Sequence, residues 1–260
     1  KEGDNVLSVR VDHSRYADSR WYTGSGIYRD VWLIAAPEIH LAQWGTGWHA
    51  TSLTNRQATI AVDMEVQKHI ATNDRLELSA TLYDAAGKQV AQRRTRVSDG
   101  KEGITKENLT LKITNPHRWN LDDPYLYTLK TELLSNGQRI DGCETKVGLR
   151  TLKFDPNKGF ALNDNWMKVK GVCLHHDAGV LGAVVPPEVW ERRLNNLKEI
   201  GVNAIRMSHN PQAPVVYDLC DRLGLLIMDE ASDEWEFPKR KWVKGWNKGD
   251  PAYDGSFDFF

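Results

Sequence analysis

The sequence has 260 residues, of which 40% are hydrophobic and 27% are charged, and its formal net charge at pH 7 is −1. This composition is typical of a folded globular chain, so it excludes long disorder and any broad electrostatic attraction to nucleic acid or anionic membranes. No run of about 18 apolar residues occurs, so the sequence predicts no membrane-spanning helix.

Residues 1–36 are strand-like and rich in aromatic side chains. Val6, Val9 and Val11 lie among polar residues, and the turn Gly24-Ser25-Gly26 separates two aromatic runs. This pattern predicts the last strands of a β-domain. Because the strand pattern starts at once, with no initiating methionine or signal peptide, we expect a chain cut from something longer. The compartment stays open, and a periplasmic or extracellular location is expected over a cytoplasmic one.

Residues 37–149 repeat an alternation of apolar and polar residues, the period of a strand with one buried face. The alternating positions fall in four sets: Ile60, Val62, Met64 and Val66; Leu76, Leu78, Ala80 and Leu82; Leu109, Leu111 and Ile113; and Tyr125, Tyr127, Leu129, Thr131 and Leu133. Asp84-Ala85-Ala86-Gly87 predicts a turn, and Asn136-Gly137 is a strong hairpin signal. Strands and turns at this spacing indicate an immunoglobulin-like β-sandwich.

From residue 150 to 260 the pattern changes to short apolar strands separated by amphipathic helices. Residues 169–173, 202–207 and 225–228 are the expected strands. Each helix is opened by proline and closed by glycine, and each has one apolar face. These faces are Trp190, Leu194, Leu197 and Ile200 before Gly201, and Val216, Leu219, Cys220 and Leu223 before Gly224. Strands that alternate with helices predict a parallel sheet covered by helices.

A closed (β/α)₈ barrel usually needs about 250 residues, so residues 151–260 would supply less than half of one. Three parallel strands without closure would expose strand edges and an apolar face. We therefore expect this part to be poorly ordered or to pack against a second copy of the chain, giving a homo-oligomer through the incomplete barrel.

Polar side chains follow each predicted parallel strand. In parallel α/β folds ligands bind at the carboxyl ends of the strands, so these residues are the candidate site. They are His175, His176 and Asp177 after the first strand, Ser208, His209 and Asn210 after the second, with Arg206 near its end, and Asp229 and Glu230 at the end of the third. The alternative for a single member is structural: Arg206 could simply hold Asp229 or Glu230 in an ion pair.

Other chemistries fit the residues less well. His175 and His176 are neighbours, and neighbouring side chains on a strand diverge, so they do not form one metal site. No Gly-rich phosphate loop and no Gly-x-Ser-x-Gly nucleophile motif is present. Cys143, Cys173 and Cys220 match neither a disulfide framework nor a zinc pattern. Histidine and asparagine beside tryptophan suit a neutral sugar.

The motifs resemble glycoside hydrolase family 2. Residues 171–177, 203–211 and 217–230 are similar to the barrel start of that family, and residues 19–33 resemble the end of its sugar-binding jelly roll. Trp119 with residues 124–127 resembles a signature of its central sandwich. The tail 235–242 resembles a Bacteroidetes-type β-galactosidase branch. The resemblance implies three parts: the last jelly-roll strands (1–36), an immunoglobulin-like sandwich (37–149), and the first three βα units of a TIM barrel (150–260).

The resemblance also implies the chemistry, which is retaining β-glycoside hydrolysis of a carbohydrate substrate by two glutamates. Both glutamates are expected after residue 260, so no catalytic residue is expected in this chain, which would be inactive alone. Expected substrate contacts are His175, Asp177, His209, Asn210 and Trp235; Arg206, Asp229 and Glu230 are expected to support the site. No cofactor is expected, because the magnesium pattern that some relatives have near Glu234 is altered.

Two alternatives to a β-galactosidase stay open. A β-glucuronidase or β-mannosidase would use the same chemistry, but a glucuronide needs a cationic contact, and no extra basic residue is visible at the strand ends. The other alternative is a non-catalytic carbohydrate-binding or scaffold module made of the two β-blocks.

Overall fold

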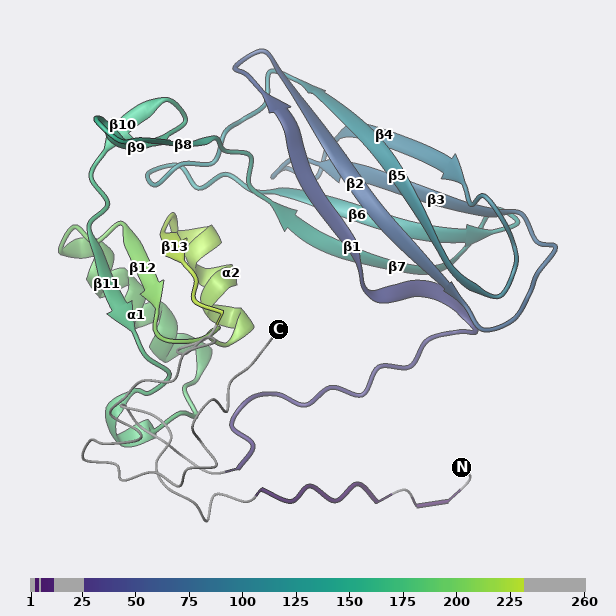
Figure 1. Ribbon diagram of the computed structural model, residues 1–260, viewed down its shortest axis with the longest axis horizontal. Helices are drawn as coiled ribbons and strands as arrows, with labels where there is room; N and C mark the ends of the chain where they lie inside the picture. Colours follow the sequence, from purple (N-terminus) through teal and green to yellow (C-terminus); the bar gives the residue numbers. More distant parts are fainter. Residues whose placement is uncertain (1–2, 5, 12–25, 232–260) are drawn as a thin grey trace. The chain divides into compact units, whose positions relative to one another are not determined.

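The computed structural model describes residues 3–4, 6–11 and 26–231. The chain divides into two compact units, and each is described by itself. One unit comprises Lys1–Val31, Lys170–Cys220 and Leu225–Phe260, within the described ranges. The other comprises Trp32–Val169 and Asp221–Gly224. The first carries the parallel strands, and the second carries the β-sandwich (Figure 1).

The β-sandwich consists of two antiparallel sheets. One sheet has the order β1-β2-β5 and the other the order β4-β3-β6-β7. The strands are β1 (Ile39–Leu53), β2 (Gln57–Lys68), β3 (Leu76–Tyr83), β4 (Gln89–Arg96), β5 (Gly103–Thr114), β6 (Tyr127–Ser135) and β7 (Gln138–Val147). Two packed antiparallel sheets confirm the sandwich that the alternation predicts.

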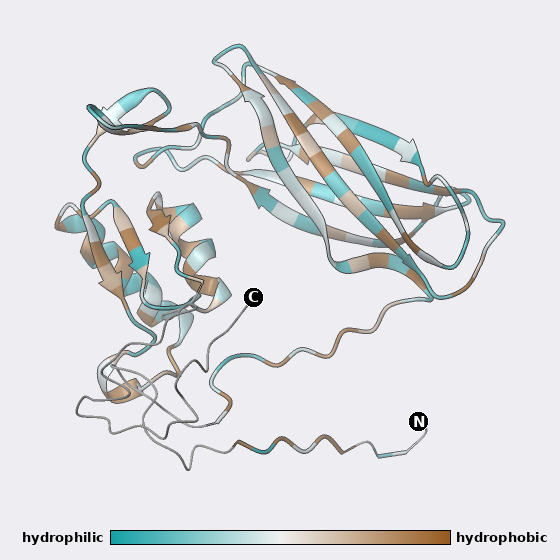
Figure 2. Ribbon diagram, in the orientation of Figure 1, coloured by the Kyte–Doolittle hydropathy of each residue, from teal (hydrophilic) through white to brown (hydrophobic). Residues whose placement is uncertain are grey.

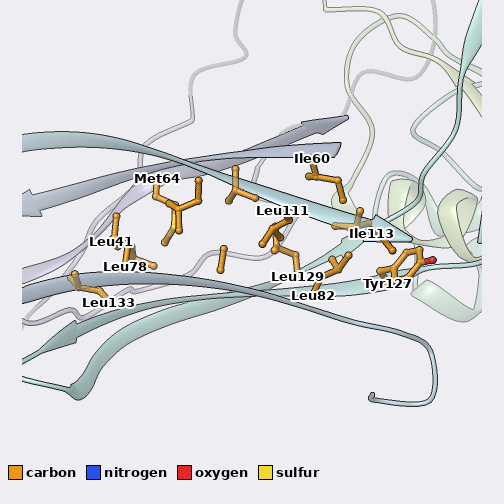
Figure 3. Close-up of a cluster of buried hydrophobic side chains, with 14 of the residues drawn as sticks. Leu41, Ile60, Met64, Leu78, Leu82, Leu111, Ile113, Tyr127, Leu129 and Leu133 are labelled. Atoms are coloured by element: carbon orange, nitrogen blue, oxygen red, sulfur yellow. The ribbon is translucent and has the colours of Figure 1, made fainter. Parts of the chain in front are cut away.

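The alternating residues form the core of this sandwich. On β2, Ile60, Val62, Met64 and Val66 are all fully buried. The apolar positions of β5 lie beside them in the same sheet, and those of β3 and β6 complete the core from the other sheet. Figure 2 shows the alternation along β2 and β5, and Figure 3 shows the side chains meeting between the layers. The period of two therefore places one side of each strand in the core, as expected.

Both predicted turns join neighbouring strands. Asp84 Oδ1 accepts hydrogen bonds from the backbone amides of Ala86 and Lys88, and Gly87 has a φ of 79°, which favours glycine. Asn136 and Gly137 both have positive φ, 50° and 84°, as a two-residue hairpin between β6 and β7 requires. These turns set the register of the sheet that contains β3, β4, β6 and β7.

A small antiparallel sheet follows the sandwich, and the sequence reading did not predict it. It has the order β10-β9-β8, with β8 (Leu152–Asp155), β9 (Gly159–Leu162) and β10 (Asn165–Met167). It belongs to the same compact unit as the sandwich. The assignment of residues 150–260 to one domain stays a prediction.

The other unit contains the predicted parallel sheet. Its strands are β11 (Gly171–Leu174), β12 (Ala204–Met207) and β13 (Leu226–Met228), paired in parallel in the order β11-β12-β13. A 3₁₀ turn, η1 (Gly179–Leu181), follows β11, and the helices are α1 (Pro187–Glu199) and α2 (Pro214–Leu223). Gly201 and Gly224 have φ of 89° and 73°, so both end their helices as predicted.

Two expectations of this unit are wrong in part. Ile200 was expected on the buried face of the first helix, but it is 77% exposed, because α1 ends at Glu199 and Ile200 is already its cap. The strands expected within residues 1–36 are not formed in the described part of that block. An alternating pattern becomes a strand only where a neighbouring strand satisfies its backbone groups, and residues 6–11 and 26–36 pair with none of the described strands.

Residues 12–25 and 232–260 lie outside the described residues, so most of the glycine-rich turn and Trp235 are not described. Among the described residues, every helix is too short or too polar to cross a membrane.

Candidate functional site

The carboxyl ends of the three parallel strands lie in register. Leu174, the last residue of β11, pairs with Met207, the last residue of β12, and Arg206 pairs with Met228, the last residue of β13. The polar residues that follow each strand therefore start from one edge of the sheet. The backbone amide of Ser208 also donates to the Leu174 carbonyl at 3.0 Å, which extends the alignment past the strands.

Glu230 connects two of these strand ends. Its Oε1 accepts hydrogen bonds from the Arg206 guanidinium, and its Oε2 lies 2.9 Å from Nδ1 of His209. The Arg206 guanidinium also donates to the Cys173 sulfur at 3.8 Å. Because the carboxylate favours the charged form of its partner, the pKa of Arg206 is raised. Arg206 and Glu230 thus form the ion pair that the structural alternative describes, and His209 is held by the same carboxylate.

The ring of His175, which follows β11, packs against the ring of His209, which follows β12. The two rings meet edge to face with centroids 5.4 Å apart. Burial lowers the pKa of His175, and the nearby His209 and Arg206 lower it further against the opposing effect of Asp177 and Glu230. His175 is therefore uncharged at neutral pH and can act as both donor and acceptor.

A second series of side-chain contacts joins the loops after β11 and β12. His176 Nε2 is hydrogen-bonded to Asn210 Oδ1. On the other side of the ring, Arg29 donates to His176 Nδ1 at 3.0 Å and to the Pro211 carbonyl at 2.9 Å. Tyr28 meets the His176 ring edge to face. The sequence motifs named His176 and Asn210 as candidates but gave no role to Tyr28 or Arg29, and Arg29 is 147 residues from His176 along the chain.

Asp229 is held by a different partner from Glu230. The Tyr217 hydroxyl donates to Asp229 Oδ1 at 2.8 Å and accepts from the backbone amide of Gln212 at 3.2 Å. Burial, and then the bond to Asp229, raise the pKa of Tyr217 to about 12. The buried Gln212 side chain donates in turn to the Leu174 carbonyl at 3.1 Å. Tyr217 and Gln212 thus brace the strand ends, and the sequence reading missed Gln212.

The remaining candidates are less engaged in this cluster. The Asp177 backbone carbonyl accepts a hydrogen bond from Arg193 at 3.0 Å, and the Asp177 charge opposes the lowering of the pKa of both His175 and His176. Trp235 lies outside the described residues. The structure therefore brings together His175, His209, Asn210, Arg206 and Glu230 at one sheet edge, while their contacts with a sugar stay predictions.

Within the described residues, no group of three or more His, Cys, Asp or Glu side chains could hold a metal ion. Glu234, where a magnesium site would be sought, is not among them. Glu230 and Asp229, although adjacent, turn to Arg206 and Tyr217 respectively. That the pair supports a sugar site stays a prediction.

Two models of one family match the chain. Residues 43–150 match the model described as glycosyl hydrolases family 2, and residues 156–240 match the model of the TIM barrel domain of the same family. The first match covers the sandwich strands, and the second covers β11 to β13 with their polar ends. Both matches agree with the order of parts that the sequence motifs indicate.

Several individual proteins are similar to this chain. The β-galactosidase BoGH2A of Bacteroides ovatus is 45% identical over 90% of this chain, which spans 28% of that protein. A putative β-glucuronidase of Formosa agariphila is 33% identical over 90% of this chain, which spans 22% of it. A crystal structure of a glycosyl hydrolase family 2 member from Bacteroides cellulosilyticus matches with a TM-score of 0.82 and 33% identity. The match covers 92% of this chain and 32% of the chain in that crystal structure. The chain belongs to glycosyl hydrolases family 2.

Proposed function

We propose that this chain is part of a retaining β-glycosidase that acts on β-galactosides, and that the carboxyl ends of β11, β12 and β13 contact the sugar. The observation that carries the proposal is the cluster of His175, His209 and Asn210 at the edge of a parallel sheet. It occurs in a chain that is 45% identical to a β-galactosidase.

The chemistry of the cluster suits a neutral, hydroxyl-rich ligand. A neutral imidazole offers one donor and one acceptor, and a sugar hydroxyl can satisfy both. Burial keeps His175 uncharged, and Glu230 orients His209 through Nδ1, so that Nε2 is the nitrogen directed away from the carboxylate. Such oriented side chains raise the rate only by placing the reacting bond correctly, since they do not themselves attack it.

The catalytic carboxylates are proposed to come from residues beyond Phe260, as the family resemblance implies. Retaining glycosidases place an acid and a nucleophile about 5–5.5 Å apart on opposite sides of the scissile bond. Glu230 is held by Arg206 and His209, and Asp229 by Tyr217, so neither carboxylate is placed for that role. We therefore propose that the 260-residue chain alone does not hydrolyse glycosides.

A β-glucuronidase is the second candidate, because the similar protein of Formosa agariphila carries that name. A glucuronide carboxylate would need a cation at the site. Among the described residues at this edge, three guanidinium groups are already engaged: Arg206 with Glu230, Arg29 with His176 and Pro211, and Arg193 with Asp177. Because these three arginines already have partners, the site favours a neutral sugar over a glucuronide.

The test compares aryl glycosides on the complete gene product that contains this chain. We expect nitrophenol release from the aryl β-galactoside, and at least tenfold lower kcat/KM on the β-glucuronide and β-mannoside, the size of selectivity that a few polar contacts provide. The 260-residue chain alone is the control and should release none. A preference for the glucuronide would overturn the substrate, and turnover by the short chain would overturn the placement of the carboxylates.

A further inference from the structure

Arg29 reaches the strand-end cluster from a segment far away in the sequence. It belongs to the same compact unit as β11 and β12. Its guanidinium makes two contacts there: one with Nδ1 of His176, after β11, and one with the carbonyl of Pro211, after β12. The guanidinium also lies 5.2 Å from the centre of the Tyr28 ring, and Tyr28 packs edge to face on His176. One side chain thus spans the two loops that carry the candidate sugar contacts.

The contacts fix which nitrogen of His176 carries the proton. Arginine has donors and no acceptor, so the His176 Nδ1 that faces it must present a lone pair. The proton of the neutral ring is then on Nε2, which donates to Asn210 Oδ1. Because the oxygen of Asn210 is committed to His176, the amide nitrogen is turned to the opposite side. The donor and acceptor roles in both contacts, from Arg29 to His176 and from His176 to Asn210, therefore follow from the Arg29 cation.

We propose that Arg29 is a positioning residue that sets the tautomer of His176 and, through it, turns the Asn210 amide so that its N–H donors face the sugar site. The inference rests on the proposed function for the identity of the ligand, a sugar oxygen that accepts a hydrogen bond. The tautomer and the amide orientation do not depend on which sugar binds.

The electrostatics of the cluster favour the same state. Burial lowers the pKa of His176, and the charges of Arg29 and His175 act in the same direction, whereas the bond to Asn210 and the charge of Asp177 oppose them. The ring is therefore neutral near pH 7. A protonated His176 would place an Nδ1–H against the Arg29 donors, which the observed contact excludes.

The direct test is nitrogen NMR of the histidine rings in the 260-residue chain. In the wild type we expect His176 to carry its proton on Nε2, with Nδ1 unprotonated. Arg29→Met keeps the length of the side chain but removes the charge and the donors, so the tautomers should mix and the pKa of His176 should rise. Arg29→Lys restores a cationic donor and should recover the Nε2 tautomer. Arg192→Met, at an exposed arginine of α1, is the matched control and should change neither.

Two results would overturn the proposal. One is a wild-type His176 with its proton on Nδ1, which requires no variant. The other is an unchanged tautomer and pKa in Arg29→Met when amide exchange shows the unit still folded. A purely structural role for Arg29 would give this second result.

Asn210→Asp separates the tautomer from sugar binding. The carboxylate still accepts from His176 Nε2, so the tautomer should persist, while the amide donors are lost. In the complete gene product, Arg29→Met and Asn210→Asp should each raise KM for the aryl β-galactoside by about tenfold or more with a smaller change in kcat. If no aryl β-galactoside is turned over, the proposed function fails while the NMR result still decides the role of Arg29. If both variants keep the wild-type KM, the Asn210 donors do not face the sugar.

Discussion

Replacing Tyr217 with phenylalanine should loosen the carboxyl end of the parallel sheet. The hydroxyl donates to Asp229 at 2.8 Å and accepts from the Gln212 amide at 3.2 Å, so the change removes two hydrogen bonds and leaves a backbone donor unsatisfied. A lost hydrogen bond with an unsatisfied buried partner costs about 1–3 kcal/mol. Since the Tyr217 ring is only partly buried, we expect about 1–2 kcal/mol.

The pH dependence of Tyr217 gives a second magnitude. Its pKa is about 12 in the folded chain, against about 10 for a free tyrosine, so the difference sets an upper limit of about 2.7 kcal/mol before solvent screening reduces it. Because the pKa of Tyr217 is raised in the folded chain, its contribution to the unfolding free energy is complete below about pH 10. This contribution is lost as the pH rises through about 12. Burial also raises the pKa of Tyr127, so a spectroscopic titration should show late-ionising tyrosines in the wild type and one fewer of them in Tyr217→Phe.

The assay for the stability loss is amide hydrogen exchange at pH 7 on peptides that cover α2 and β13. Tyr217→Phe should lower the opening free energy there by about 1–2 kcal/mol. Tyr83→Phe is the matched control, because its hydroxyl makes no hydrogen bond to another described residue, and it should leave these peptides unchanged. Equal protection in the two variants, or a loss below about 0.5 kcal/mol, would refute the bracing role of Tyr217.

Three further predictions concern the core, a buried charge and the site. Leu78→Ala, in the fully buried core, should lower the unfolding free energy of the sandwich by about 2–5 kcal/mol in urea, whereas Ile104→Ala, at a side chain that is 55% exposed, should cost far less. Lys68→Met keeps the buried aliphatic stem of the side chain and removes the ammonium near the half-exposed Asp99. The unfolding free energy measured in urea should therefore change by less than about 1 kcal/mol, and a loss as large as that of Leu78→Ala would contradict this. Glu230→Gln removes the charge that holds Arg206 and His209, and in the complete gene product it should raise KM for the aryl galactoside about tenfold, while Glu199→Gln at an exposed position should not.

The sandwich could be predicted where burial is one-sided. Along β2 and β5, buried residues largely alternate with more exposed ones, and the alternation in the sequence records this directly. The strand β4 escaped prediction because its two apolar side chains, Val90 and Ala91, are adjacent rather than alternating, and the rest of this edge strand is polar. β1 escaped because two register shifts interrupt its alternation.

The site could be predicted only in part. His175, His209 and Glu230 were predictable because each follows a strand, and parallel strands end at one edge. Arg29 was not, because nothing local marks a residue that acts at a sequence separation of 147. Gln212 and Tyr217 were missed as site residues because their role is to connect loops, and this depends on how a helix packs against a sheet.

We propose that the polar side chains at the ends of β11, β12 and β13 line one sugar site. A crystal structure of the complete gene product with bound galactose tests it most directly. We expect the sugar ring at this sheet edge, within hydrogen-bond distance of His175 and His209 and facing the Asn210 amide nitrogen. Galactose bound at the active site with none of these three side chains in contact would contradict it.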